Sequence, residues 1–216
     1  MKNNIAIIDV ETGGTNYLEN PITQLSLTAI EPVNFSTIKD YTTFVKPYED
    51  LKITPAALEH SRVTMKQINN GIEIKKLVKD LILVFKELTY RGKNGKPTLA
   101  GHNFGFDIDF LEYAFKVVNQ DLYTYVNRFH YCTMRLYVDM EGGDKNSDKL
   151  KYNLTNLSER YGIELTSAHG AEADANVTKE LLIRYLKRVR NARQDNNEND
   201  NTKQKSKSRG KFVFEF

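Results

Sequence analysis

The sequence contains one cysteine, Cys132, and four histidines among its 216 residues. A single thiol cannot form a disulfide within the chain, and this scarcity fits a reducing compartment such as the cytoplasm. A zinc site built from cysteine and histidine is disfavoured for the same reason. No apolar stretch is long enough to span a membrane, and the first residues do not form a signal-peptide pattern. Carboxylate oxygens are therefore the ligands that this chain offers to a metal ion.

Charge is scarce in net terms and unevenly placed. The formal net charge is +3, and residues 203–216 contain five Lys or Arg and one Glu, so the rest of the chain is close to neutral. Length and composition predict one domain over residues 1–190 and a basic tail over 191–216 that lacks an apolar pattern and is disordered on its own. The tail ends in aromatic residues at 212, 214 and 216. Docking on a protein partner through 203–216, contact with nucleic acid and no role at all are equally open for it.

An apolar run at the start of the chain ends in two acidic residues one position apart. Ile5–Val10 reads as a buried strand, and Asp9 and Glu11 stand at its end. Because side chains alternate along a strand, both carboxylates are expected on the same side. Two neighbouring carboxylates repel each other, and a divalent cation between them relieves that repulsion. An isolated pair of this kind is also compatible with a solvated strand end.

The apolar pattern predicts further strands at 22–30, 41–46 and 98–101. Helix starts are indicated at Thr54-Pro55 and Thr64, and a long amphipathic helix is predicted from Ile74 to Leu88. Further helices are expected at 105–118, 153–161 and 171–189. This order of elements predicts an α/β fold, in which helices flank a mixed sheet.

Two more clusters combine residue types that carry out chemistry. Residues 101–107 run from a strand into a helix start and include His102, Asn103 and Asp107, and residues 169–174 lead into the last long helix and include His169 and Asp174. Each cluster has an ordinary explanation, because acidic residues in a first helical turn are favoured by the helix dipole and a loop histidine is common.

Taken together, the three clusters resemble the DEDDh family of 3′→5′ exonucleases, which includes proofreading subunits of bacterial replicative polymerases and the RNA-trimming enzyme RNase T. Asp9-Val10-Glu11-Thr12 is similar to the family's first motif. His102-Asn103 through Phe106-Asp107 is similar to the second, and His169 with Asp174 to the third. The resemblance covers about residues 5–186.

The resemblance implies an RNase H-like fold and a metal-dependent nuclease. Two Mg²⁺ or Mn²⁺ ions would be held by four carboxylates, namely Asp9, Glu11, Asp107 and Asp174. His169 would act as general base, with Glu11 also counted as catalytic. Contacts with the terminal nucleotide are expected from Thr12, Gly13, His102, Asn103 and Phe106. For Phe106 and its neighbour Phe104, stacking on a base and packing of the helix against the sheet are both open.

Three functions remain open at this point. The first is a 3′→5′ exonuclease acting on single-stranded or frayed DNA 3′ ends. The second is the same reaction on RNA, since no residue shows how the pocket treats a 2′-hydroxyl. The third is an inactive nuclease fold that serves as a binding subunit. Loss of a carboxylate or of His169 would indicate the third function, and all of these residues are present.

Overall fold

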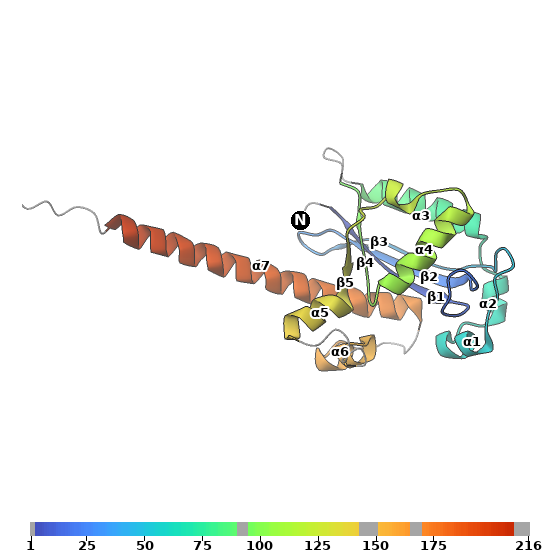
Figure 1. Cartoon of the computed structure of the whole chain (residues 1–216). Helices are drawn as coiled ribbons and strands as arrows, with labels where there is room; N and C mark the ends of the chain where they lie inside the picture. The colour runs from blue at the N-terminus through green and yellow to red at the C-terminus, as the bar shows by residue number, and fades with distance from the viewer. Residues whose placement is uncertain (1–2, 90–94, 143–150, 165–169, 210–216) are drawn as a thin grey trace, which may run out of the picture. The chain divides into compact units, whose positions relative to one another are not determined.

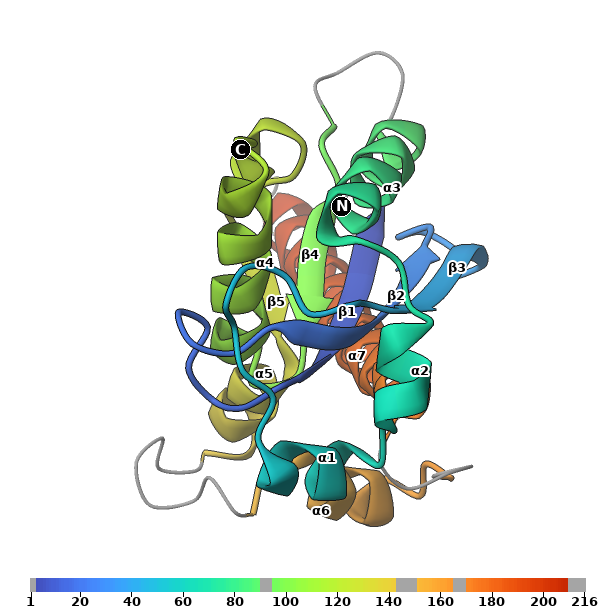
Figure 2. The same ribbon diagram turned by 90° about the vertical axis from the view of Figure 1, so that its right-hand side faces the viewer.

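A five-stranded mixed sheet forms the centre of the computed structural model, which describes residues 3–89, 95–142, 151–164 and 170–209. The strand order is β3-β2-β1-β4-β5 (Figures 1 and 2). β1 runs antiparallel to β2 and parallel to β4. The strands are β1 (Ile5–Thr12), β2 (Ile22–Ile30), β3 (Thr37–Phe44), β4 (Thr98–Gly101) and β5 (His130–Cys132). The predicted class, an RNase H-like mixed sheet flanked by helices, is confirmed.

Helices cover both faces of the sheet. α3 and α4 lie on one face, and α5 lies on the other together with the part of α7 up to Leu181 (Figures 1 and 2). A buried hydrogen bond of 2.9 Å from the Tyr137 hydroxyl of α5 to the Leu181 carbonyl joins the second pair. The helices are α1 (Pro55–Ser61), α2 (Met65–Asn69), α3 (Ile74–Leu88), α4 (Gly105–Val117), α5 (Thr133–Glu141), α6 (Leu154–Arg160) and α7 (Ala171–Arg209), with a 3₁₀ turn, η1 (Leu122–Thr124).

β1 carries its acidic pair on the face that is turned away from the main core. Ala6, Ile8 and Val10 belong to the main apolar core, which also contains buried residues of α3 and α4. Asp9 and Glu11 therefore point to the opposite face of the sheet. β2, the neighbour of β1, is buried along its whole length, so the strand next to the acidic pair is shielded from water.

Local sequence signals account for several of the elements. The Thr54 hydroxyl caps α1 by accepting a hydrogen bond from the Ala57 N–H at 3.2 Å, with Pro55 at the first helical position. Thr64 and Gln67 form a capping box at α2. The apolar face predicted for α3 is buried, as are β2 and β4 at their predicted bounds.

Other elements differ from the prediction. β3 begins at Thr37 rather than at residue 41, because an edge strand with exposed polar side chains shows little apolar alternation. β5 and α5 were not predicted, since a three-residue strand is too short to give a pattern. α7 continues to Arg209, beyond the end predicted at 189 and through residues expected to be disordered. Extending an existing helix avoids the cost of nucleating one.

The chain divides into two units, Met1–Leu181 and Leu182–Phe216. The division lies within α7, and the assignment of residues 1–190 to one domain and 191–216 to a tail stays a prediction. Among the described residues, none of the helices is both long enough and apolar enough to cross a membrane.

The turn between β4 and α4 requires glycine at position 101. A Cβ atom added to Gly101 would lie 2.0 Å from Cδ2 of Phe104, whose ring is fully buried in the core. We expect Gly101→Ala to lower the free energy of unfolding by about 1–3 kcal/mol, because the buried ring must move. Urea denaturation followed by circular dichroism measures this loss.

Gly105→Ala is the matched control, since a Cβ atom at Gly105 meets nothing within 4 Å at the start of α4. It should be neutral or slightly stabilising, by up to about 1 kcal/mol. Equal losses in both variants would contradict the packing explanation.

Candidate metal and nucleic-acid site

The centre of the site is the stretch where β1 extends beyond its parallel neighbour. β1 pairs with β4 from Ile5 to Ile7 and then continues to Thr12. In place of a strand, the first turn of α4 meets this edge: the Val10 N–H donates to Oδ1 of Asp107 at 3.0 Å. Because α4 begins four residues after β4 ends, and β4 is the neighbour of β1, the short turn places Asp107 next to β1. The hydrogen bond keeps one carboxylate oxygen against the strand.

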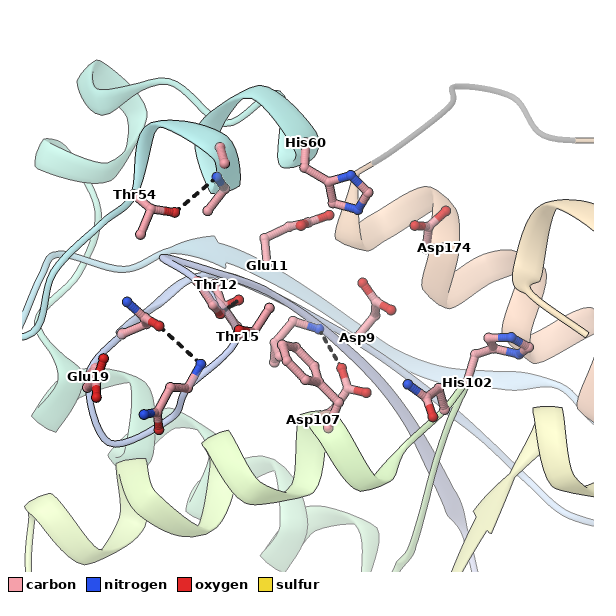
Figure 3. A pocket seen from close by; sticks show the side chains of 18 residues that line it. Asp9, Glu11, Thr12, Thr15, Glu19, Thr54, His60, His102, Asp107 and Asp174 are labelled. Atoms are coloured by element: carbon pink, nitrogen blue, oxygen red, sulfur yellow. Dashed lines mark hydrogen bonds between the residues drawn. The ribbon is translucent and has the colours of Figure 1, made fainter. Parts of the chain in front are cut away.

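Three further carboxylates meet at the same place. One oxygen from each of Asp9, Glu11 and Asp174 lies within 4.8 Å of the others, so Asp9 and Glu11 do share a side, as predicted. Asp174 comes from the first turn of α7. Figure 3 shows the carboxylates of Asp9, Glu11 and Asp174 turned toward a common space, with Asp107 below them on α4. An all-oxygen donor set of this kind suits a hard divalent cation.

Burial and mutual repulsion make the charged form of these groups costly. Burial raises the pKa of Asp9 well above its usual value, and the charges of three neighbouring carboxylates raise it further. Burial, followed by the charges of Asp174 and Asp107, raises the pKa of Glu11 from 4.5 to about 7. Burial also raises the pKa of Asp107 from 3.8 to about 7, although the hydrogen bond from Val10 acts in the opposite direction. A cation at this point would remove the penalty.

The carboxylates form part of the lining of a pocket of about 760 Å³, a volume within the range of small-molecule and nucleotide sites. The lining residues are Asp9, Val10, Glu11, Thr12, Gly14, Thr15, Asn16, Glu19, Asn20, Thr54, Ala56, Ala57, His60, His102, Asn103, Phe106, Asp107 and Asp174. Of the predicted substrate contacts, Thr12, His102, Asn103 and Phe106 are thus brought to the pocket.

His102 lies at the pocket as a neutral side chain. Burial lowers its pKa from 6.5 to about 4. Its Nδ1 lies 2.9 Å from the hydroxyl oxygen of Thr133, and that hydroxyl donates its proton to the Gly101 carbonyl at 3.2 Å. The next residue, Asn103, adopts a left-handed backbone with φ of 53°, a conformation that asparagine tolerates.

The two phenylalanines of the second motif have different surroundings. Phe104 is fully buried in the main core, so it packs the helix against the sheet and cannot stack on a base. Phe106 lines the pocket, with its ring centroid 4.9 Å from that of Phe110. A ring that packs against a neighbouring ring and also lines a pocket can stack on a base.

Gly13 is buried beside the pocket and is not among its lining residues. Its N–H donates to the Pro21 carbonyl at 2.8 Å, and its carbonyl accepts from Thr54 N–H at 2.8 Å. A Cβ atom here would lie 2.7 Å from Pro21 Cδ and 2.8 Å from Lys52 O. Gly13 therefore connects the end of β1 to the start of α1, while its contact with substrate stays a prediction. His169 lies outside the described residues.

The sequence prediction missed one wall of the pocket. Thr15, Asn16, Glu19 and Asn20 come from the loop after β1, and Thr54, Ala56, Ala57 and His60 come from α1 and its cap. Thr54-Pro55 signalled that a helix begins there but not which strand it lies against. No local pattern in the sequence could have placed His60 beside Glu11, because that proximity depends on how the segments between them fold.

Comparison with known proteins agrees with this geometry. The model of the RNase T-type exonuclease family, described as "Exonuclease", matches residues 6–182. The chain is 27% identical over 178 residues to the 3′-5′ exonuclease DinG of Staphylococcus saprophyticus, and 28% identical over 181 residues to the PolC-type DNA polymerase III of Latilactobacillus sakei. These matches cover 82% and 84% of this chain but 17% and 11% of the relatives, so the chain spans less than a fifth of their length.

Solved structures show the same fold. The nuclease domain of 3′hExo, described as a DEDDh family member bound to rAMP, superposes with a TM-score of 0.71 at 15% identity, covering 86% of this chain and 92% of that one. Escherichia coli exonuclease I in complex with a dT13 oligonucleotide superposes with a TM-score of 0.68 at 21% identity, covering 90% and 43%.

The raised carboxylate pKa values predict how stability depends on pH. Since the folded pKa of Glu11 exceeds its value of 4.5, the folded state binds more protons between about pH 4.5 and 7. Without metal, this group therefore makes the protein less stable as the pH rises through that window. Thermal unfolding in a chelator at pH 5 to 8 should show that Glu11→Gln loses less stability with rising pH than the wild type.

Glu59→Gln is the control, because Glu59 is exposed on α1 and does not line the pocket. Its pH dependence should match that of the wild type, and added Mg²⁺ or Mn²⁺ should reduce the wild-type loss at pH 8. If the melting temperature of the wild type in chelator rises relative to that of Glu11→Gln as the pH increases, the proposed repulsion is absent.

Proposed function

We propose, because this chain belongs to the DEDDh-type 3′→5′ exonuclease family, that it hydrolyses phosphodiester bonds at single-stranded or frayed DNA 3′ ends and releases nucleoside 5′-monophosphates. The observation that carries the proposal is the convergence of Asp9, Glu11, Asp107 and Asp174 in one nucleotide-sized pocket. The four groups come from three elements far apart in the sequence, which is the arrangement expected of a site rather than of a solvated surface.

The donor set fits a pair of divalent ions, Mg²⁺ or Mn²⁺. Asp9, Glu11 and Asp174 offer converging oxygens, and the carboxylate of Asp107 lines the same pocket. Bound there, the ions would supply an activated water and neutralise charge on the phosphoryl group. The raised pKa values of Asp9, Glu11 and Asp107 support this, because closely spaced acidic groups in a partly buried site are costly to ionise without a counter-charge.

The remaining residues would orient the substrate and move a proton. His169, five residues before Asp174 in the sequence, is the proposed general base for the attacking water. Phe106 would stack on the terminal base from the α4 side. Thr12 and the backbone at Gly13 would contact the terminal nucleotide near the end of β1, and His102 and Asn103 would contact it near the start of α4.

DNA is the first choice of substrate, and RNA the second. The two curated relatives are a 3′-5′ exonuclease and a DNA polymerase, while one structural neighbour was solved with a ribonucleotide and another with a DNA oligonucleotide. An assay on 3′-labelled single strands of DNA and RNA, with and without Mg²⁺, decides between them. Loss of label from neither strand would favour the inactive binding fold instead.

The location and partners of the protein also belong to this proposal. The scarcity of cysteine supports a cytoplasmic protein. The polymerase relative supports a protein partner, for which the basic, aromatic-ended residues 203–216 are the proposed contact. That contact stays a prediction from the sequence.

Replacing Asp9 or Asp107 with Asn should nearly abolish hydrolysis while the fold is kept. In Asp107→Asn the amide keeps an oxygen that can accept from the Val10 N–H, so the loss reports the charge and not the hydrogen bond. Thermal stability without metal should hold or rise, because a repelling charge is removed. Asp109→Asn is the control, since Asp109 is exposed on the same helix and lies outside the pocket. Full activity of either first variant in Mg²⁺ would falsify the metal-site assignment.

His169→Ala should lower turnover by about 10²- to 10⁴-fold, the usual contribution of a general base, with binding of a single strand largely retained. Turnover of the wild type should rise with pH along the acidic limb as the imidazole loses its proton. Single-turnover hydrolysis and fluorescence anisotropy separate the two effects. A rate equal to that of the wild type would leave His169 without a catalytic role.

A further inference from the structure

The pocket has an unusual charge balance for a site that takes a polyanion. Its described lining contains five acidic residues and neither lysine nor arginine. Bound cations can offset charge at the carboxylates, but a single strand also brings phosphates that need hydrogen-bond donors from the protein. Besides the amides of three asparagines and the hydroxyls of three threonines, the side-chain donors in the described lining are two imidazoles, those of His60 and His102.

His102 is not suited to this role. Its ring is largely enclosed, burial keeps it neutral, and its Nδ1 is hydrogen-bonded to the Thr133 hydroxyl. A group held in this way contributes to the shape of the pocket. His60, in contrast, is exposed in the last turn of α1.

His60 lies directly across the pocket from α4. Figure 3 shows its ring extending from α1 over the carboxylate of Glu11, on the opposite side from Asp107. The position of α1 is set by the hydrogen bond from Thr54 N–H to Gly13 O and by the cap at Thr54. The hydrogen bond between Gly13, which follows β1, and Thr54, which precedes α1, therefore also positions His60 at the site.

We propose that His60 is a substrate-positioning residue that donates an N–H hydrogen bond to a phosphate oxygen of the strand at its 3′ end, on the α1 side of the carboxylates. This inference rests on the proposed nuclease function and adds a contact for which α1 is responsible. Imidazole suits the position, because a ring N–H can donate a hydrogen bond to a phosphate oxygen.

Three variants test the contact: His60→Ala removes the donor, His60→Gln keeps an N–H donor at a similar distance from the backbone, and Glu59→Ala changes the neighbouring exposed residue of α1 that does not line the pocket. Steady-state hydrolysis of a single-stranded DNA oligonucleotide should give a KM about tenfold higher for His60→Ala, with kcat within about twofold, the size expected for losing one hydrogen bond to a charged group. His60→Gln should recover most of the loss, and Glu59→Ala should behave as the wild type.

The chemical partner is identified by altering the substrate. Affinity is measured by fluorescence anisotropy with Ca²⁺ replacing Mg²⁺, for an all-phosphate strand and for strands with one uncharged methylphosphonate at each of the last three linkages. At the linkage that His60 contacts, wild type and His60→Ala should bind the methylphosphonate strand equally, while they differ about tenfold on the phosphate strand.

The outcomes separate this inference from the function beneath it. If the wild type hydrolyses the strand and His60→Ala matches it in KM and affinity, the contact is overturned while the nuclease function stands. If the affinity loss of His60→Ala is the same on every methylphosphonate strand, His60 does not contact a phosphate. If the wild type has no nuclease activity, the proposed function fails, and the affinity measurements still decide the contact. Circular dichroism verifies that each variant is folded.

Discussion

Repulsion among four carboxylates at the end of β1 is the constraint to which the rest of the structure responds. A protein gains nothing in stability by gathering acidic groups in a partly buried pocket, as the raised pKa values of Asp9, Glu11 and Asp107 show. The sheet and its two helical layers must therefore supply enough buried apolar surface to hold an unfavourable centre in place. β1 combines the two tasks, since one of its faces belongs to the main core and the other carries the acids.

The site is built on backbone that has few alternatives. Asp107 is held by the Val10 N–H, and Gly13 is enclosed by Pro21 and Lys52 so closely that a larger residue would displace them. Preorganisation of this kind holds the carboxylates in place before any metal ion or substrate binds. Enzymes obtain much of their advantage over reaction in water from such fixed groups. In this chain the same contacts that hold the acids together also place α1 across from them.

Features that depend on interactions between residues close in the sequence could be predicted, and features that depend on distant residues could not. Caps, the apolar face of α3 and the bounds of β2 and β4 depend on neighbours in the chain, and all agree with the structure. The grouping of Asp9, Asp107 and Asp174 could be anticipated from the family resemblance. β5, the early start of β3 and the position of His60 depend on packing between distant segments, and no local pattern encodes them.

The short parallel pairing between β1 and β4 has a consequence for the life of the chain. Asp9 and Asp107 are separated by most of a hundred residues, and Asp174 follows much later, so the carboxylates cannot assemble until long-range pairing is complete. Such pairings form slowly, and a growing polypeptide emerges from the ribosome with its amino end first. A nascent chain therefore carries Asp9 and Glu11 well before Asp107 and Asp174 have been made, and the four carboxylates can come together only after nearly all of the domain has been synthesised.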